Sequence, residues 1–432
     1  MATLFKDVLI LDGAMSKASR GHILVSKGRI ESVLDAGQTP PTADKIVSGH
    51  GHMAVIPGFV NAHTHAAMTL VRGLGEEAPL MEWLQEKVWP VEAKLTADHI
   101  YWGTLSAMLE MLATGTTCFA DMYFEMERVA EAALGAGMRA ALCRGIMADA
   151  KDPGKVERSL QNNLELAERW HGREGLITVQ LGPHAPYTVP VNDMKKITAA
   201  AKERGLGVHV HYLETEWELN YIKDELKTTP EGYLRDTGLL DAPHAVLAHS
   251  VWLDPKLSDS IDMSDITLVH NPCSNLKLGS GVMPLNEWLE RDVSVALGTD
   301  GASSNNRLDM WEEMRTAALL HKGVNKNPLC ITAIEALRMA TYEGARAFGF
   351  AQKGMIREGW MADLVLVDLD SPHYIGANEE NLATYIVYAG SSADVRGTMV
   401  NGKWLYRAGE YPTLDREEIT ERAREARNAI TR

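Results

Sequence analysis

The stretch Val55–His65, which reads VIPGFVNAHTH, is a short apolar run that ends in two histidines. An apolar run of this length, bounded by turn residues, predicts a strand that is buried on both faces. Because side chains alternate faces along a strand, His63 and His65 point the same way and can bind one cation. The stretch therefore predicts a buried strand with a candidate metal site at its carboxyl end.

The H-x-H spacing alone is weak evidence for a metal, because it occurs twice more in the chain. One pair is His50 and His52, and the other is His209 and His211. The first pair is flanked by glycines ahead of the strand, so we interpret it as two exposed loop histidines. The sequence around His63 and His65, rather than their spacing, must therefore decide whether they bind a metal.

Seven further short apolar runs follow, and helices of a dozen or more residues lie between most of them. This alternation is typical of repeated βα units and a parallel sheet. Eight such strands predict an α/β fold that closes into a (β/α)8, TIM-like barrel over residues 55–353. The predicted strands are 55–65, 117–123, 139–147, 177–184, 207–212, 245–249, 267–271 and 294–300.

The two ends of the chain have a different sequence pattern, in which short β-type runs are separated by turn residues. This pattern spans residues 4–47 and recurs after Gly354, where Asn401-Gly402 predicts a two-residue hairpin turn. We expect the two ends to meet in one small β-sandwich. Its predicted parts are residues 1–54 and residues 354–432, the second of which also includes a C-terminal helix.

Metal-binding and titratable residues recur at the last positions of the predicted strands. Barrel enzymes carry their chemistry at the C-terminal ends of their strands. Scattered core histidines would have no reason to gather there, so the pattern favours one common site. The residues are His63 and His65 on the first strand, His184 on the fourth, His211 on the fifth, His249 on the sixth and Asp300 on the eighth.

Composition excludes several classes of function. The formal net charge of -15 disfavours nucleic acid and anionic lipid surfaces as partners. The four cysteines include no C-x-x-C pair, so neither a thiolate zinc site nor a disulfide framework is indicated. The N-terminus lacks a secretory pattern and no apolar run reaches about 18 residues, so we expect a cytoplasmic protein with no membrane partner.

Several motifs together resemble the amidohydrolase superfamily. They are PGFVNAHTH at 57–65, the H-x-x-E of 211–214, His249 and the GTDG of 298–301. The resemblance implies that His63, His65, His211 and Asp300 bind one divalent metal ion, most often zinc, with Fe²⁺ or Mn²⁺ as alternatives. His209 is then expected to be an inward-facing barrel residue.

A metal in such a site lowers the pKa of bound water, so that water can attack an electron-poor carbon near neutral pH. By the same resemblance, Asp300 takes the proton of the water. Glu214 carries a proton to a ring nitrogen and on to the leaving group as general acid and base. His249 hydrogen-bonds the attacking oxygen or the leaving group.

The resemblance narrows to the 5'-methylthioadenosine/S-adenosylhomocysteine deaminases. The motifs that carry it are MTLVRG at 68–73, EWL at 82–84, DMYF at 121–124, GPHAPY at 182–187 and NPCSNLKL at 271–278. The implied reaction is hydrolytic deamination of adenine nucleosides at C6, with release of ammonia. The implied partners are a small-molecule nucleoside and further copies of the chain in a homo-oligomer.

This resemblance also implies substrate contacts. Glu92 would bind the ribose hydroxyls, Arg144 the amino-acid end of S-adenosylhomocysteine, and His184 the bound nucleoside. Trp83 either packs on the purine or belongs to the core, a choice that the sequence leaves open. Lys155 stands where some relatives have a second arginine, and lysine lacks the planar two-point grip on a carboxylate.

Two alternative functions follow from the same residues. A related amidohydrolase could act on guanine, a pterin, cytosine or a chlorinated triazine, none of which offers a ribose to Glu92. A barrel without activity could serve as a scaffold, although every expected ligand is present in the sequence.

Overall fold

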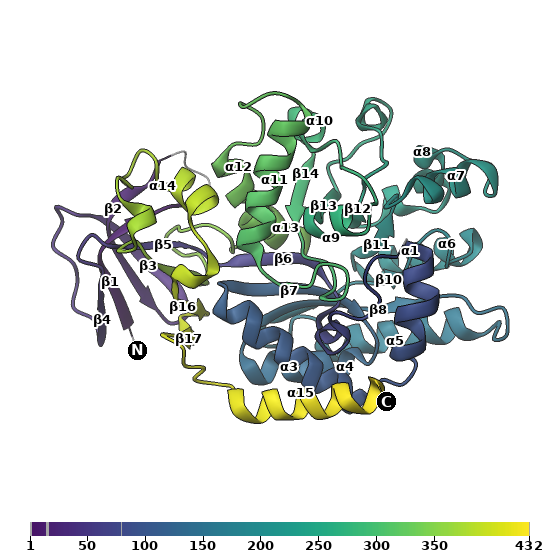
Figure 1. Cartoon of the computed structure of the whole chain (residues 1–432), viewed down its shortest axis with the longest axis horizontal. Helices are drawn as coiled ribbons and strands as arrows, with labels where there is room; N and C mark the ends of the chain where they lie inside the picture. The colour runs from purple at the N-terminus through teal and green to yellow at the C-terminus, as the bar shows by residue number, and fades with distance from the viewer. Residues whose placement is uncertain (1, 14–16, 79, 432) are drawn as a thin grey trace.

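A computed structural model of the chain describes residues 2–13, 17–78 and 80–431. The predicted terminal segments begin and end on residues 1 and 432, which lie outside this description together with 14–16 and 79. The molecule contains one sheet at one end and two parallel sheets that carry most of the helices (Figure 1). No helix of the described residues is both long and apolar enough to cross a membrane.

The parallel strands follow one another in chain order, and their carboxyl ends carry the candidate site. In the first sheet β8 pairs with β7, β9 and β10, and β7 pairs with β6; the second has the order β11-β12-β13-β14. The bounds are β6 (Phe59–Thr64), β7 (Thr116–Tyr123), β8 (Arg139–Ile146), β9 (Ile177–Val179), β10 (Gly182–Pro183), β11 (Val208–Tyr212), β12 (Ala245–His249), β13 (Ile266–His270) and β14 (Ser294–Leu297).

The backbone hydrogen bonds between the two parallel sheets are sparse. A single bridge joins Leu181 to Val208 on one side. On the other side no ladder links the described residues of β14 and β6, although the amide of Asp300 donates to the carbonyl of His63 at 2.9 Å. The prediction of an α/β fold with parallel strands is therefore confirmed, whereas a continuously hydrogen-bonded barrel is not seen.

The prediction of one continuous first strand is wrong, because the strand is interrupted at Gly58. Residues Met53–Pro57 form β5 of the terminal sheet, and β6 starts at Phe59. A Cβ atom on Gly58 would lie 2.3 Å from Cγ2 of Thr117, so only glycine fits at this crossing point. The fourth predicted strand is likewise divided, into β9 and β10.

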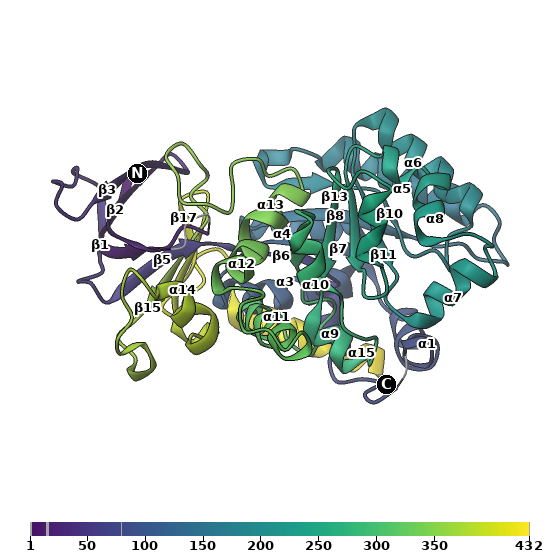
Figure 2. The same cartoon turned by 90° about the horizontal axis from the view of Figure 1, so that it is seen from above.

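Strands from both ends of the chain share one eight-stranded sheet, which lies beside the start of β6 (Figure 2). Its order is β17-β16-β15-β5-β1-β2-β3, and β4 pairs with β1. Asn401 and Gly402 both have positive φ, as a tight hairpin turn requires. The bounds are β1 (Ala2–Ile10), β2 (Ser19–Ser26), β3 (Arg29–Asp35), β4 (Lys45–Ser48), β15 (Leu364–Asp368), β16 (Val395–Val400) and β17 (Lys403–Arg407).

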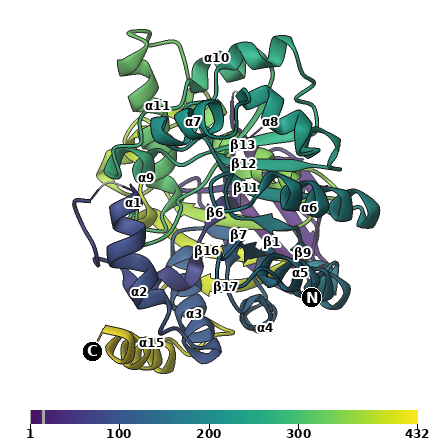
Figure 3. The same ribbon diagram turned by 90° about the vertical axis from the view of Figure 1, so that its right-hand side faces the viewer.

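Helices surround the parallel strands when they are viewed from the right-hand side of Figure 1 (Figure 3). The 3₁₀ helix η1 (Ala66–Val71) follows β6 directly. The α-helices are α1 (Leu80–Glu82), α2 (Trp89–Glu92), α3 (Ala97–Ala113), α4 (Met126–Ala136), α5 (Lys155–Trp170), α6 (Val191–Arg204), α7 (Glu216–Asp224), α8 (Pro230–Asp236), α9 (Pro272–Lys277), α10 (Leu285–Glu290), α11 (Met310–Val324), α12 (Ala333–Arg338), α13 (Gly344–Ala347), α14 (Leu382–Thr384) and α15 (Arg416–Thr431).

The C-terminal helix α15 packs against α3, away from the terminal sheet that precedes it in the chain. Its residue Arg427 donates to the carbonyl oxygens of Leu70 and Arg72, at 3.0 and 2.9 Å. These carbonyls lie in and just after η1. The helix therefore holds the segment that follows the first parallel strand.

A buried ion network joins the terminal sheet to the parallel strands. Asp363 accepts hydrogen bonds from Arg139 at 2.6 and 3.1 Å and lies 3.2 Å from Nζ of Lys353. Burial alone would raise the pKa of Asp363, but the two neighbouring cations lower it to about 2. The carboxylate is therefore ionised and paired at neutral pH.

Replacing Asp363 with Ala should lower the free energy of unfolding by about 3–5 kcal/mol, because two buried cations lose their partner. Urea titration of the full chain measures this change. The exposed pair Arg422–Glu425 provides the control, since Glu425→Gln should cost less than about 1 kcal/mol. Equal losses for the two variants would contradict the interpretation of the network.

Candidate metal and substrate site

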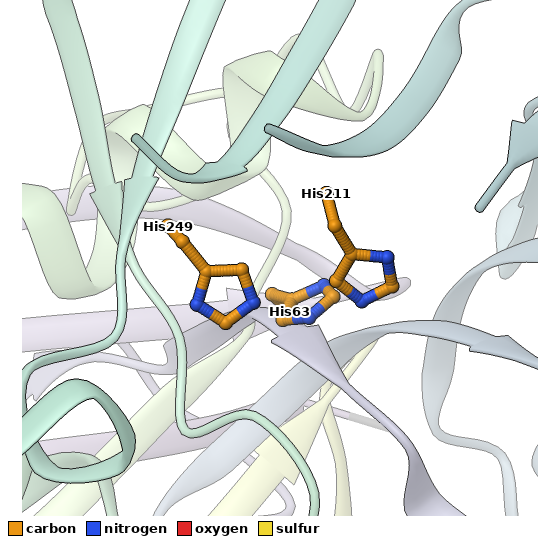
Figure 4. A group of neighbouring side chains, drawn as sticks. All are labelled: His63, His211 and His249. Carbon is orange, nitrogen blue, oxygen red and sulfur yellow. The ribbon is translucent and has the colours of Figure 1, made fainter. Parts of the chain in front are cut away.

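Five predicted site residues converge where the parallel strands end. Nε2 of His65 and Nε2 of His63 lie 3.3 and 3.6 Å from Oδ1 of Asp300. Nε2 of His211 lies 3.4 Å from Nε2 of His65. The rings of His63, His211 and His249 also gather together, although they come from three different strands (Figure 4).

The backbone at these strand ends is unusual, which aims the side chains inward. His249 has φ of 72° and Asp300 has φ of 62°, in the left-handed region that non-glycine residues rarely adopt. Such conformations cost of order 1–3 kcal/mol each and persist only where the surroundings enforce them. Their presence at the last residue of β12 and just after β14 supports a functional role for this end of the strands.

Hydrogen bonds to backbone carbonyls show that Nδ1 of His65 and Nδ1 of His211 each carry a proton. Nδ1 of His65 lies 2.6 Å from the carbonyl oxygen of Met122, and Nδ1 of His211 lies 2.7 Å from that of His184. A carbonyl only accepts, so both Nδ1 atoms carry a proton, and Nε2 is the nitrogen of each ring that is left to bind a cation. The two Nε2 atoms lie 3.4 Å apart, so both can reach one ion.

The remaining donor atoms fit a divalent metal ion. Nε2 of His63 is buried and has no hydrogen-bond partner among the described residues. The ligand atoms of His63, His65 and Asp300 lie within 4.8 Å of one another, and so do those of His63, His211 and His249. Imidazole nitrogens with one carboxylate oxygen are a donor set that suits zinc and neighbouring transition metals.

Asp300 is held as a carboxylate by three hydrogen bonds. The hydroxyls of Ser274 and Ser304 donate to Oδ2 at 2.6 and 2.7 Å, and the amide of Gly301 donates to Oδ1 at 2.7 Å. Burial opposes ionisation, but the hydrogen bond and charge of His65 dominate and lower the pKa of Asp300 well below its usual value. The carboxylate is thus positioned as a base or as a ligand.

Glu214 lies near His249, and the pKa of its carboxyl is raised, whereas that of Asp300 is lowered. Burial and the charge of Asp300 raise the pKa of Glu214 to about 8, so the carboxyl is largely protonated at neutral pH. The hydroxyl of Ser280 donates to its Oε1 at 3.1 Å, and Nε2 of His249 lies 3.8 Å from its Oε2. Burial lowers the pKa of His249 to about 4, which keeps this imidazole neutral. A protonated carboxyl beside an ionised one is an arrangement that general acid-base chemistry uses.

A pocket with a mainly apolar wall opens from these residues. Trp83 is buried in this wall, and Glu92 and His184 line it too. Burial raises the pKa of Glu92, which accepts a hydrogen bond from the Tyr123 hydroxyl. The pocket is also lined by His65, Met68, Leu80, Leu84, Trp89, Met122, Phe124, Gly145, Met147, Tyr187, His211, Glu214, His249, Leu278 and Asp300.

Two basic residues considered in the sequence lie apart from this lining. Arg144, near the end of β8, forms an ion pair with Glu125 at 3.3 Å. Lys155, the first residue of α5, lies 3.7 Å from Asp149. Of the described residues that line the pocket, none is lysine or arginine.

Two further residues touch the site: His209, which the sequence predicts only as an inward-facing barrel residue, and Tyr123, for which the sequence predicts no function. His209 is buried in β11, and its Nε2 lies 3.0 Å from Nδ1 of His63. This contact orients a candidate metal ligand, which an inward-facing histidine two positions from His211 could have signalled. Tyr123 lies at the end of β7, and its position at a strand end was the available signal for its contact with Glu92.

Comparisons with known proteins agree with this geometry. Residues 54–405 match the model of the amidohydrolase family. A 5-methylthioadenosine/S-adenosylhomocysteine deaminase of Dictyoglomus thermophilum is 45% identical over 87% of both chains. A 5'-deoxyadenosine deaminase of Methanosarcina mazei is 40% identical over 97% of this chain and 95% of its own.

A solved structure extends the likeness to three dimensions. The adenosine deaminase of Xanthomonas campestris, solved with bound zinc, has a TM-score of 0.91 and 32% sequence identity. The alignment covers 99% of this chain and 98% of that one. The chain therefore belongs to the amidohydrolase family, within the group of the 5-methylthioadenosine/S-adenosylhomocysteine deaminases.

Proposed function

We propose that this chain hydrolyses adenine nucleosides at C6, replacing the amino group with oxygen and releasing ammonia. The substrates would be 5'-methylthioadenosine and S-adenosylhomocysteine, with adenosine and 5'-deoxyadenosine as further candidates. The observation that carries this proposal is the convergence of the candidate metal ligands with Glu214 and His249 at a pocket that Glu92 also lines. The names of the relatives from Dictyoglomus and Methanosarcina support the same reaction.

His63, His65, His211 and Asp300 would hold one divalent ion, for which we propose zinc. When bound, the ion acts as a Lewis acid that allows a water molecule to ionise near neutral pH. Support comes from the Nδ1 contacts of His65 and His211 with backbone carbonyls, which leave Nε2 of each ring for a metal, and from the unpartnered Nε2 of His63. The zinc in the Xanthomonas structure supports the choice of element.

The residues of this chain would then move the protons. Asp300 accepts a proton from the attacking water, since its carboxylate is ionised and fixed by Ser274 and Ser304. Glu214 donates its proton to a ring nitrogen of the purine, which makes C6 more electrophilic. His249, neutral and 3.8 Å from Glu214, hydrogen-bonds the attacking oxygen.

The pocket walls would bind the nucleoside. Glu92 accepts hydrogen bonds from the ribose hydroxyls, Trp83 packs on the purine and His184 contacts the nucleoside. All three line the pocket, which supports these roles. Arg144 would reach the amino-acid end of S-adenosylhomocysteine after parting from Glu125. Lys155, which lies 3.7 Å from Asp149, lacks the planar two-point grip on a carboxylate that a second arginine would have.

We also propose that residues 55–353 form a closed (β/α)8 barrel from β6 onwards, and that residues 1–54 and 354–432 form a small β-sandwich that β5 joins and a C-terminal helix, α15, that packs on α3. The contact between the backbones of Asp300 and His63 and the bridge from Leu181 to Val208 support closure. We also propose that the protein forms a homo-oligomer in the cytoplasm. Exposed apolar side chains, such as Leu329, which is 80% exposed, are consistent with contacts between subunits.

The zinc-loaded protein should deaminate 5'-methylthioadenosine, because the candidate metal ligands and the proton-transfer groups Glu214 and His249 converge at one pocket. Loss of adenosine absorbance and release of ammonia measure the reaction. The metal-loaded Glu214→Gln variant is the matched control and should lose at least about a hundredfold in kcat, since it removes the acidic proton. No turnover of any adenine nucleoside by the wild-type chain would contradict the proposal.

Metal analysis should find one zinc per wild-type chain and much less in His211→Ala, which loses a candidate ligand. The effect on stability should match, because an ion that binds the folded state raises the melting temperature. The exposed His52 is the control, and His52→Gln should keep full zinc content. A His211→Ala protein with wild-type zinc content would remove His211 from the ligand set.

Glu92→Ala should lower kcat/KM for nucleosides by about tenfold to a hundredfold, because a hydrogen bond to a charged group contributes about 1.5–3 kcal/mol. Turnover of free bases should change little, since a base has no ribose. Parallel assays with 5'-methylthioadenosine, guanine and cytosine separate the proposal from its alternative. Guanine turnover that exceeds nucleoside turnover in the wild-type chain would favour the free-base reaction.

A further inference from the structure

Two amide side chains contact the same nitrogen of His249. Nδ2 of Asn275 lies 2.9 Å from Nδ1 of His249, and Nδ2 of Asn271 lies 3.2 Å from the same atom. Asn271 is the N-cap residue of α9, and Asn275 lies one turn later in that helix. All three side chains are buried, with at most 1% exposed. The outer edge of the His249 ring is therefore enclosed by amide N–H groups.

This enclosure determines the tautomer of His249. In this orientation the amide nitrogens of Asn271 and Asn275 donate to Nδ1 of His249, which accepts and carries no proton, while the Oδ1 atoms of both amides have no hydrogen-bond partner among the described residues. A neutral imidazole with a bare Nδ1 carries its proton on Nε2. That nitrogen faces the pocket, 3.8 Å from Oε2 of Glu214. The proton of His249 thus points towards the reacting groups.

The tautomer decides between two possible roles for His249. Its position relative to His63 and His211 would allow it to be a metal ligand. A ligand, however, has to offer a lone pair, as His65 and His211 do because their Nδ1 protons are taken by backbone carbonyls. His249 has the reverse arrangement, since its outer nitrogen meets donors. Its Nε2 can donate a hydrogen bond but cannot coordinate a metal.

We propose that Asn271 and Asn275 are positioning residues that hold His249 as the Nε2–H tautomer, a hydrogen-bond donor to the substrate side of the pocket. The inference rests on the proposed function only for its kinetic test. It assigns a task to the NPCSN segment at 271–275, which contacts Asp300 through Ser274 as well. One helix start would thus orient both the base and the donor of the site.

The tautomer can be observed directly in the wild-type full chain labelled with ¹⁵N-histidine. The His249 signals are assigned by their absence from the spectrum of His249→Gln. We expect Nε2 to have the shift of a protonated nitrogen and Nδ1 that of an unprotonated one, both before and after zinc loading. A protonated Nδ1, or loss of the Nε2 proton when zinc binds, would overturn the proposal.

Asn275→Asp tests the cause of this tautomer, because a carboxylate of the same shape accepts a proton where the amide donates. We expect the His249 proton to move to Nδ1, with kcat lower by about tenfold to a hundredfold, as for other residues that orient a site. KM should stay within about threefold, since no contact with the substrate is lost. Unchanged tautomer and kcat would contradict the assignment.

Asn325→Asp is the matched control, because this amide donates to the His321 carbonyl and does not line the pocket. It should keep the wild-type kcat and the wild-type His249 signals. If Asn275→Asp does not fold, Asn275→Ser replaces it, with the same expected direction and a smaller loss because Asn271 still donates. Absence of nucleoside turnover in the wild-type chain would remove the proposed function and leave the spectral test intact.

Discussion

The site depends on where the protons of a few imidazole rings lie. The backbone carbonyls of Met122 and His184 accept from Nδ1 of His65 and His211, which leaves the two Nε2 atoms 3.4 Å apart and free to bind one ion. The strand ends, the left-handed backbone at Asp300 and the serine hydroxyls around its carboxylate all maintain this one geometry.

Much of this arrangement could be predicted from the sequence because it depends on local patterns. Apolar runs identify strands, and polar residues at their last positions identify a common edge. For this reason His63, His211, His249 and Asp300 were placed at one end of the parallel strands. The N-terminal cap of α3 is a similarly local contact, since the side chain of Thr96 accepts a hydrogen bond from the amide of His99.

The features that escaped prediction depend on contacts between distant parts of the chain. Gly58 ends one sheet and starts another because its amide donates to Asp363, and its Cα lies against Thr117. The apolar pattern of residues 55–65 does not indicate that the strand changes its pairing partner at Gly58. The pairing of Arg144 with Glu125 is similar, because a long side chain can turn either towards a pocket or away from it.

The contact of α15 with η1 has a consequence for how the pocket is completed. Residues 416–431 are synthesised after every strand of the molecule, yet Arg427 holds the carbonyls of Leu70 and Arg72. The segment that includes Met68 of the pocket wall therefore owes two of its hydrogen bonds to this late helix. Proteolytic trimming or a bulky fusion at that helix would disturb substrate fit from a distance, while each metal-binding side chain stayed untouched.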